Sequence, residues 1–328
     1  MIRLAGPAAV VAARVMARSS ARRGGSQLPV DAVVREVVAL MRGGVPAAQA
    51  WRVLHEDRRD LGSELEGRRD VPPEVAELLL TGAATATALA AGPGPEWRLL
   101  AALWRLAELS GAPLVSTLER FLHSLGELHR VAERRTVLLS APRATIRLIG
   151  ALPPVALLLG ALLGFDPLRA LAHPTAWVML LLGALLLALG VCWARGLAAR
   201  VARADWVAGW EFELAATALA GGGSTGVGLR QAVECADLAR SEWIPLEALG
   251  PGGDVSQVLA RADRLGVPRM RLLLGEAATR RTEAQAKLER AAERLGVTVL
   301  IPLGVCVLPA FVLLGVVPVL MAVLGGAF

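Results

Sequence analysis

Hydrophobic and polar positions follow a helical period over most of the chain, and three stretches become continuously apolar. Apolar side chains recur three and four positions apart between residues 28 and 147 and again after residue 195, which predicts amphipathic helices. Three further stretches are long and apolar enough to predict membrane spans, at residues 148–165, 174–194 and 297–324. The pattern therefore predicts an all-α integral membrane protein.

The chain is expected to have five parts, which alternate between polar helical regions and membrane spans. They are a basic lead-in of residues 1–27, either disordered or lying on the membrane surface, a first cytoplasmic helical bundle of residues 28–147, a transmembrane hairpin of residues 148–194, a second cytoplasmic bundle of residues 195–296 and a C-terminal transmembrane helix of residues 297–324. The fold class is thus two helical bundles and three transmembrane helices.

Glycine and proline mark the turns inside both bundles. In the first bundle we expect a helical hairpin that turns at Gly43, a charged loop at residues 56–70, a helix from Pro73 to about Leu89, a helix over residues 96–109 and a long amphipathic helix after Pro113. In the second bundle we expect helices over residues 210–220 and 227–240, a loop at 245–253, and helices that start near Val255 and Pro268.

Basic residues flank the predicted transmembrane hairpin on its outer sides, whereas its connecting loop has few. Arginines cluster before residue 148 and after residue 194, and the positive-inside rule places such segments in the cytoplasm. We therefore expect a multi-pass protein with a cytoplasmic N-terminus and a C-terminus on the outer side. Small residues such as Gly183 and Gly304 would allow the spans to pack closely.

The two halves of the chain carry corresponding motifs in the same order, which predicts a tandem repeat. The stretch GAPLVSTLERF at 111–121 corresponds to GVPRMRLLLGE at 266–276, and each precedes a basic segment and a span. Ala112 and Pro153 are 41 positions apart (153 − 112), and Val267 and Pro309 are 42 apart (309 − 267). Each copy would be a cytoplasmic helical bundle followed by a span.

These segments, with LIPLGVCVLPAFVLLGVVPVL at 300–320, resemble the type II secretion system F domain family, and within it the TadB and TadC branch of Tad (Flp) pilus assembly. The resemblance implies a non-enzymatic platform in the bacterial cytoplasmic membrane. It implies that such a platform engages a hexameric secretion ATPase, pilin or pseudopilin subunits, and either a paralogous platform protein or further copies of itself. Membrane lipid would be a further partner.

Charged helix faces in both bundles can bind a partner, and prolines in the spans can bend. The candidate partner-docking residues are Glu119, Arg134, Arg135, Arg280, Arg281 and Glu289, and the candidate helix hinges are Pro153 and Pro309. A proline removes a backbone donor and crowds the carbonyl four residues earlier, so a kink is expected at each.

Composition excludes several other classes. The chain has 328 residues with 55% hydrophobic and 20% charged side chains, which suits spans joined to polar domains. The net charge of +6 is scattered among acidic residues without interleaved aromatic side chains, so nucleic acid is not expected as a partner. The three cysteines are far apart and are expected to be small buried hydrophobes.

No catalytic, cofactor-binding or metal-binding constellation is expected, so the chain is predicted not to be an enzyme. Gly221, Gly223 and Gly226 match a dinucleotide-binding spacing but follow an Ala-rich helix instead of a strand. The histidines lack the spacing of a metal site. A permease-type transport subunit is the alternative function, although three spans and about 200 cytoplasmic residues do not readily line a conduction path.

Overall fold

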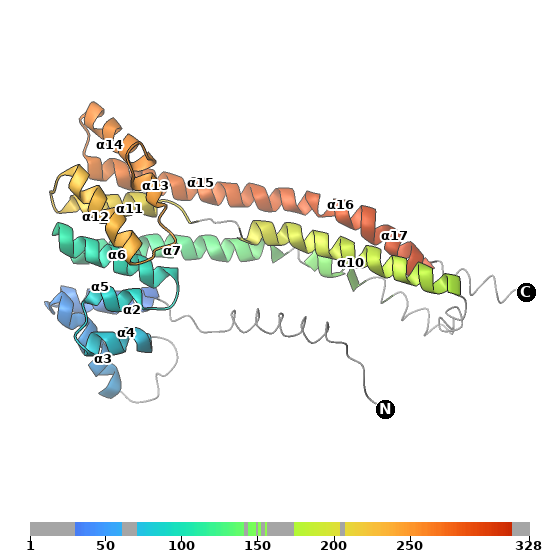
Figure 1. The fold of residues 1–328 in the computed structure, drawn as a ribbon, viewed down its shortest axis with the longest axis horizontal. Coiled ribbons are helices and arrows are strands. Elements are labelled where there is room, and N and C mark those ends of the chain that lie inside the picture. The colour runs from blue at the N-terminus through green and yellow to red at the C-terminus, as the bar shows by residue number, and fades with distance from the viewer. Residues whose placement is uncertain are drawn as a thin grey trace, which may run out of the picture. The chain divides into compact units, whose positions relative to one another are not determined.

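The computed structural model describes residues 30–60, 71–140, 144–148, 150–151, 155, 174–203 and 207–316. These residues are mostly helical and include no strand, which confirms the all-α prediction for the described part of the chain (Figure 1). The expected lead-in of residues 1–27, most of the span at 148–165 with its hinge Pro153, and residues 317–324 lie outside the described residues.

Contacts divide the chain into two compact units, and each unit draws on distant parts of the sequence. The first combines the described residues of Met1–Leu125 with Trp210–Leu274, and the second combines those of Gly126–Gly209 with Gly275–Phe328. The first unit therefore contains helices from both of the bundles expected from the sequence. The units are defined by which residues contact one another, whereas the expected boundaries at residues 147 and 195 were set by the order of segments along the chain.

The first unit is built mainly from short helices (Figure 1). They are α2 (Val30–Arg42), α3 (Ala47–Asp60), α4 (Pro73–Leu80), α5 (Thr85–Ala90), α6 (Pro95–Ser110), the first part of α7 (Leu114–Leu138), α11 (Trp210–Ala220), α12 (Thr225–Leu238), α13 (Leu246–Leu249), α14 (Asp254–Leu265) and the start of α15 (Arg269–Thr298).

Helix α6 lies at the centre of this unit, because it packs against α5, α11 and α12. Pro95 occupies its first turn, where the missing N–H costs nothing, and Gly111 ends it in a left-handed conformation at φ 72°. Nearly every side chain from Trp97 to Ala107 is buried. The ring of Trp51 from α3 lies 6.4 Å from Trp97 and 5.9 Å from Trp104, measured between ring centroids.

A close backbone approach joins the end of α6 to the end of α11. A Cβ atom on Gly221 would lie 1.5 Å from the carbonyl oxygen of Ser110, so only glycine fits there. Ser110 Oγ also donates a hydrogen bond of 3.3 Å to the carbonyl of Thr217. The first glycine of the dinucleotide-like spacing thus has a packing role.

Most helices predicted in the two bundles are present, but three expectations need correction. The expected helix from Pro73 to Leu89 is two helices, since Gly82 adopts φ 82° and turns the chain between α4 and α5. Helix α3 continues to Asp60 into the expected loop at 56–70, and the expected loop at 245–253 contains the short helix α13.

The second unit is built from long helices. It contains the rest of α7, α10 (Pro174–Arg203), the rest of α15, and then α16 (Leu300–Pro302), η2 (Leu303–Val307), α17 (Leu308–Phe311) and η3 (Val312–Val316). Its buried apolar core is formed by Leu139, Ile146, Ala194, Ala198, Leu295, Val299, Leu303 and Val307.

Glycines allow α10 to pack closely against the C-terminal helical segments. A Cβ on Gly183 would lie 2.7 Å from Cγ of Leu314, which agrees with the close packing expected there. A Cβ on Gly190 would likewise lie 2.8 Å from Cβ of Cys306. Among the described residues, no atom lies within 4 Å of such a Cβ on Gly304, so the packing role expected of it stays a prediction.

Two helices in the described residues are long and apolar enough to cross a membrane. They are Leu181–Ala202 and Arg269–Leu314, which overlap most of the described parts of the second and third predicted spans. Their apolar segments also expose large apolar side chains, since Leu181 is 71% exposed and Val305 is 63% exposed. Water does not favour such a surface, whereas lipid tails do.

The candidate hinge Pro309 lies in α17, between two π-helical segments. Pro302 directly precedes the first of these segments, η2. A proline ring displaces the carbonyl four residues earlier, and the wider i→i+5 turn makes room for that displacement. The helix therefore departs from regular geometry around Pro302 and Pro309, although the predicted hinge motion of Pro309 stays a prediction.

Candidate partner-docking surface

Spacing on two helices brings charged side chains onto one face of the second unit. On α7, Glu127, Arg130 and Arg134 are three and four residues apart, so they share a stripe. On α15, Arg281, Gln285 and Glu289 are four residues apart and form another stripe. We call the surface formed by these six residues the charged face.

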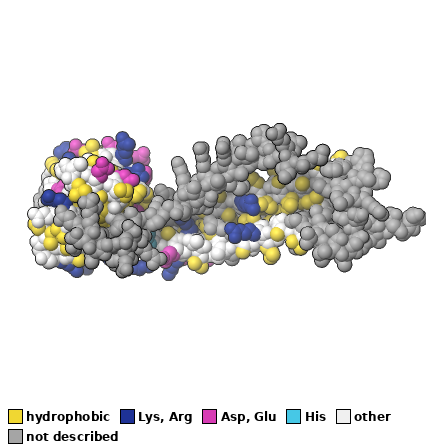
Figure 2. Space-filling view, turned by 90° about the horizontal axis from the view of Figure 1, so that it is seen from below, with side chains coloured by type: hydrophobic (Ala, Val, Ile, Leu, Met, Phe, Trp, Pro, Cys, Tyr) yellow, Lys and Arg dark blue, Asp and Glu magenta, His cyan; other side chains and the backbone are white. Residues whose placement is uncertain are grey.

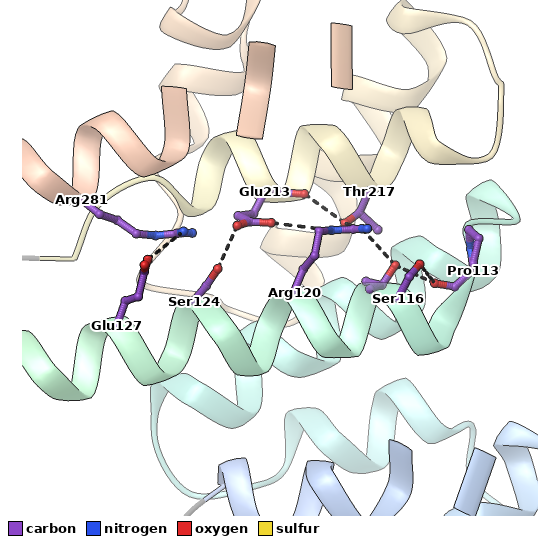
Figure 3. Close-up of polar contacts among 9 residues, drawn as sticks. Pro113, Ser116, Arg120, Ser124, Glu127, Glu213, Thr217 and Arg281 are labelled. Carbon is purple, nitrogen blue, oxygen red and sulfur yellow. Dashed lines mark hydrogen bonds and ion pairs between the residues drawn. The ribbon is translucent and has the colours of Figure 1, made fainter. Parts of the chain in front are cut away.

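Two ion pairs connect the stripes of the charged face. Arg281 Nη1 lies 3.4 Å from Glu127 Oε2 (Figure 3), and Arg134 Nη1 lies 3.3 Å from Glu289 Oε1. Gln285 Nε2 also donates a hydrogen bond of 3.1 Å to Glu289 Oε1. The Arg281 side chain is only 11% exposed and that of Arg134 is 60% exposed, so the first pair is much better shielded from water.

The charged face contains a groove of about 200 Å³. Its walls combine charged residues with Leu128, Val131, Ala278 and Thr282. Arg130 is exposed on its rim. Such a mixture of aliphatic floor and cationic rim can hold an acidic or amide side chain from another protein.

The six predicted docking residues do not form one surface. Arg134, Arg281 and Glu289 meet on the charged face, whereas Arg280 pairs along its own helix with Glu276 at 3.2 Å. Arg135 is half-buried in the last turn of α7.

Glu119 belongs to the first unit, where its Oε1 lies 2.5 Å from Arg42 Nη2. The role of the six predicted docking residues in binding a partner stays a prediction.

Sequence reasoning missed Glu127 and Gln285, which pair with predicted residues. Their signal was present in the sequence, because Glu127 precedes Arg134 by seven residues and Gln285 precedes Glu289 by four, which places each pair on one helix face. The spacing along each helix would have placed both residues on the same faces as the predicted ones, although not the contact of Glu127 with Arg281.

A buried polar cluster in the first unit was also missed. Ser124 Oγ on α7 donates a hydrogen bond of 2.8 Å to Glu213 Oε1 on α11, and Arg120 Nε lies 3.9 Å from Glu213 Oε2 (Figure 3). Ser124 is 1% exposed and Glu213 is 5% exposed. A hydroxyl beside a carboxylate resembles a nucleophile and its base, but these atoms are shielded from any substrate. The cluster joins helices and has the character of a structural contact.

The remaining candidate chemistry has structural explanations. Gly223 lies at the turn between α11 and α12 and Gly226 lies in the first turn of α12, and a helix precedes the turn, as expected. Within the described residues, no group of three or more His, Cys, Asp or Glu side chains could hold a metal ion. Cys235 is buried as expected, and burial raises the pKa of its thiol to about 11. Cys192 is exposed on α10, so the expectation of a buried side chain is wrong there.

The chain matches no family model, no curated protein and no solved structure.

Proposed function

We propose that the protein is a platform of a Tad (Flp) type IV pilus or type II-like secretion system, and that it couples a cytoplasmic secretion ATPase to pilin assembly. The proposal starts from the resemblance of residues 111–121 and 300–320 to the F domain family. It places the protein in the bacterial cytoplasmic membrane, with three spans, a cytoplasmic N-terminus and an outer C-terminus. The platform itself performs no catalysis.

The observation that carries this proposal is the continuity of the helix that contains α15. A single helical path runs from Arg269 to Leu314, and it joins a polar segment to one apolar enough to cross a membrane. Within the second unit, Arg281 and Pro309 are 28 residues apart (309 − 281), about 42 Å along a helix. A force applied at the charged face can therefore reach the apolar segment through backbone hydrogen bonds.

The charged face supplies a place for the ATPase to bind. It has a groove, ion pairs that can exchange partners, and the exposed guanidinium groups of Arg130 and Arg134. Exposed ion pairs contribute little to folding, so their rearrangement on binding costs little stability. Guanidinium groups also bind carboxylates with defined geometry.

Deletion and co-purification test the proposal together. Removing the chain from its native host should abolish surface pili, and a tagged full-length chain should purify with a secretion ATPase. Replacing Arg130 and Arg134 by Glu should weaken ATPase recovery at least tenfold, because like charges facing each other at an interface cost several kcal/mol. Replacing Arg261 and Arg264 by Glu on α14, where both side chains are exposed, is the matched control.

Persistence of pili without ATPase association would refute the platform function. Equal loss of ATPase recovery in the α14 control would refute the charged face as the docking surface. The membrane orientation has its own test, since Cys192 and a cysteine added at the C-terminus should react with impermeant reagents from opposite sides. Labelling from the same side would overturn the orientation.

A further inference from the structure

A second groove in the second unit differs from the charged face because its charges are all positive. It has a volume of about 400 Å³ and lies between α10 and α15. Its cationic lining residues are Arg200 from α10 and Lys287, Arg290 and Arg294 from α15, and none of the described lining residues is acidic. We call this the basic groove.

The sequence explains why these cations share one groove. Lys287, Arg290 and Arg294 are three and four residues apart, so they form a single stripe on α15. Arg200 completes the set from the neighbouring helix. All four side chains are exposed, and within the described residues none of them forms an ion pair with a carboxylate. Their positive charge is therefore available to an external anion.

The floor of the basic groove is apolar. Leu197 and Val201 from α10 face Ala291 and Leu295 from α15, and Leu295 also belongs to the buried core of this unit. A small free anion gains nothing from contact with an apolar floor, whereas an amphipathic molecule can bury its apolar part there. Figure 2 shows dark blue basic side chains next to yellow hydrophobic ones.

Both helices change from apolar to cationic at the level of this groove. On α10, Leu189 (56% exposed) and Trp193 (50% exposed) precede Arg200. On α15 and its continuation, Val297 (70% exposed) and Leu300 (58% exposed) follow Arg294. A tryptophan between an apolar surface and arginines is typical of a membrane interface.

We propose that the basic groove binds the phosphate headgroup of an anionic phospholipid, whose acyl chains lie against the apolar surfaces of α10 and of the helical segments after α15. The proposal rests on the membrane placement in the proposed function, but it requires neither an ATPase nor a pilin. Basic pockets at the cytoplasmic end of spans attract anionic lipids, and a lipid bridging both helices would hold α15 at a fixed depth.

The test uses the purified full-length chain in nanodiscs of phosphatidylcholine that contain a small fraction of spin-labelled phosphatidylglycerol or spin-labelled phosphatidylcholine. The protein-bound fraction of each label gives a relative association constant. Because each cation near an anionic lipid is worth about a fivefold change in affinity, two cations on one headgroup predict a preference of about 25-fold for phosphatidylglycerol.

Four variants separate the groove from general charge. Replacing Arg200, Lys287, Arg290 and Arg294 together by Gln should bring the preference to about one, and replacing only Arg290 and Arg294 should lower it at least fivefold if the larger variant does not fold. Replacing the three arginines by Lys should retain most of the preference. The control replaces Arg230, Arg261, Arg264 and Arg271 by Gln, which removes four exposed cations of the first unit.

The outcomes are distinct. An unchanged preference in both groove variants, or an equal loss in the control, overturns the proposal. Binding of inorganic phosphate is measured on the same proteins. If the intact chain shows no lipid preference but binds phosphate, and the groove variants lose that phosphate binding, the groove is a site for free phosphate and the lipid proposal is overturned. A chain that selects phosphatidylglycerol but recovers no ATPase keeps the lipid site and refutes the platform function.

Discussion

The two compact units differ in how far their large apolar side chains are buried. In the first unit six large aromatic side chains are fully buried, namely Trp51, Trp97, Trp104, Trp210, Phe121 and Phe212. In the second unit many are half or more exposed, among them Val178, Leu181, Leu185, Leu189, Trp193, Val297, Leu300 and Ile301. The first unit is therefore built around buried aromatic side chains, whereas the second unit exposes much of its apolar surface.

This difference is the one expected if the first unit folds in water and the apolar segments of the second lie in lipid, as in the proposed function. In water the burial of apolar surface drives folding, so aromatic side chains go inside. In lipid the outward face gains nothing by hiding its leucines, and close packing through small residues such as Gly183 and Gly190 holds helices together instead. Both units are helical, and their surfaces distinguish them.

The largest expected effect comes from removing a core aromatic of the first unit. Trp104 is fully buried against Trp51, and its Nε1 donates a hydrogen bond of 2.6 Å to Glu108. Trp104→Ala should lower the free energy of opening of α6 by about 3–5 kcal/mol, since it leaves a large cavity. Hydrogen exchange of α6 in the full chain measures this. Trp193→Ala, at a side chain that is 50% exposed, should change protection by less than about 1 kcal/mol, and equal effects would erase the contrast between units.

Placing a charge on the exposed apolar surface of α10 tests whether this helix lies in lipid. Leu185 on α10 is 53% exposed and Leu265 on α14 is 65% exposed, so neither substitution disturbs a buried side chain. Leu185→Arg should cost about 2.5–3.5 kcal/mol of insertion free energy if the helix lies in a bilayer. Carbonate extraction of membranes should then release or deplete this variant and retain Leu265→Arg. Full retention of Leu185→Arg would place α10 outside the lipid.

Local sequence signals predicted the helices well because each helix carries its own start and stop. Pro95 and Gly111 bound α6, and Pro113 precedes α7, close to where the pattern placed them. The helices α7 and α15 begin one residue after Pro113 and Pro268, which is compatible with the predicted repeat. Gly82 was overlooked as a turn because Ala and Leu, which favour helix, surround it.

Contacts between distant residues were beyond sequence reasoning. Glu213 lies in an Ala-rich helix and could have been solvated, and nothing in the sequence connects it with Ser124, 89 positions earlier. The composition of the first unit depends on the same long-range pairing of α6 with α11 and α12. On the charged face, spacing along each helix was readable, but the pairing of Arg281 with Glu127 requires the packing of two helices.

A medium effect is expected at the buried polar cluster of the first unit. Ser124→Ala removes the donor to Glu213 Oε1 and leaves a buried carboxylate oxygen without that bond, so the first unit should lose about 1–3 kcal/mol of stability. Ser116 on the same helix is the matched control, because its hydroxyl donates only to the carbonyl of Pro113 (Figure 3). Ser116→Ala should change the free energy of unfolding by less than about 0.5 kcal/mol in urea titrations followed by circular dichroism. A smaller loss for Ser124→Ala than for Ser116→Ala would mean that the cluster does not hold α7 to α11.

The smallest effect is expected at the exposed ion pair of the charged face. Arg134 and Glu289 are 60% and 43% exposed, so a double-mutant cycle of Arg134→Ala and Glu289→Ala should give a coupling energy of about 0.2–1 kcal/mol. In 1 M salt, where the Debye length is about 3 Å, this coupling should fall toward zero. The same cycle on Arg281 and Glu127 should retain more of its coupling in salt, because the Arg281 side chain is only 11% exposed. A coupling above about 2 kcal/mol for Arg134 and Glu289 would make the pair a structural contact like the cluster around Glu213. A weak coupling leaves these two side chains free to exchange partners, as a docking surface requires.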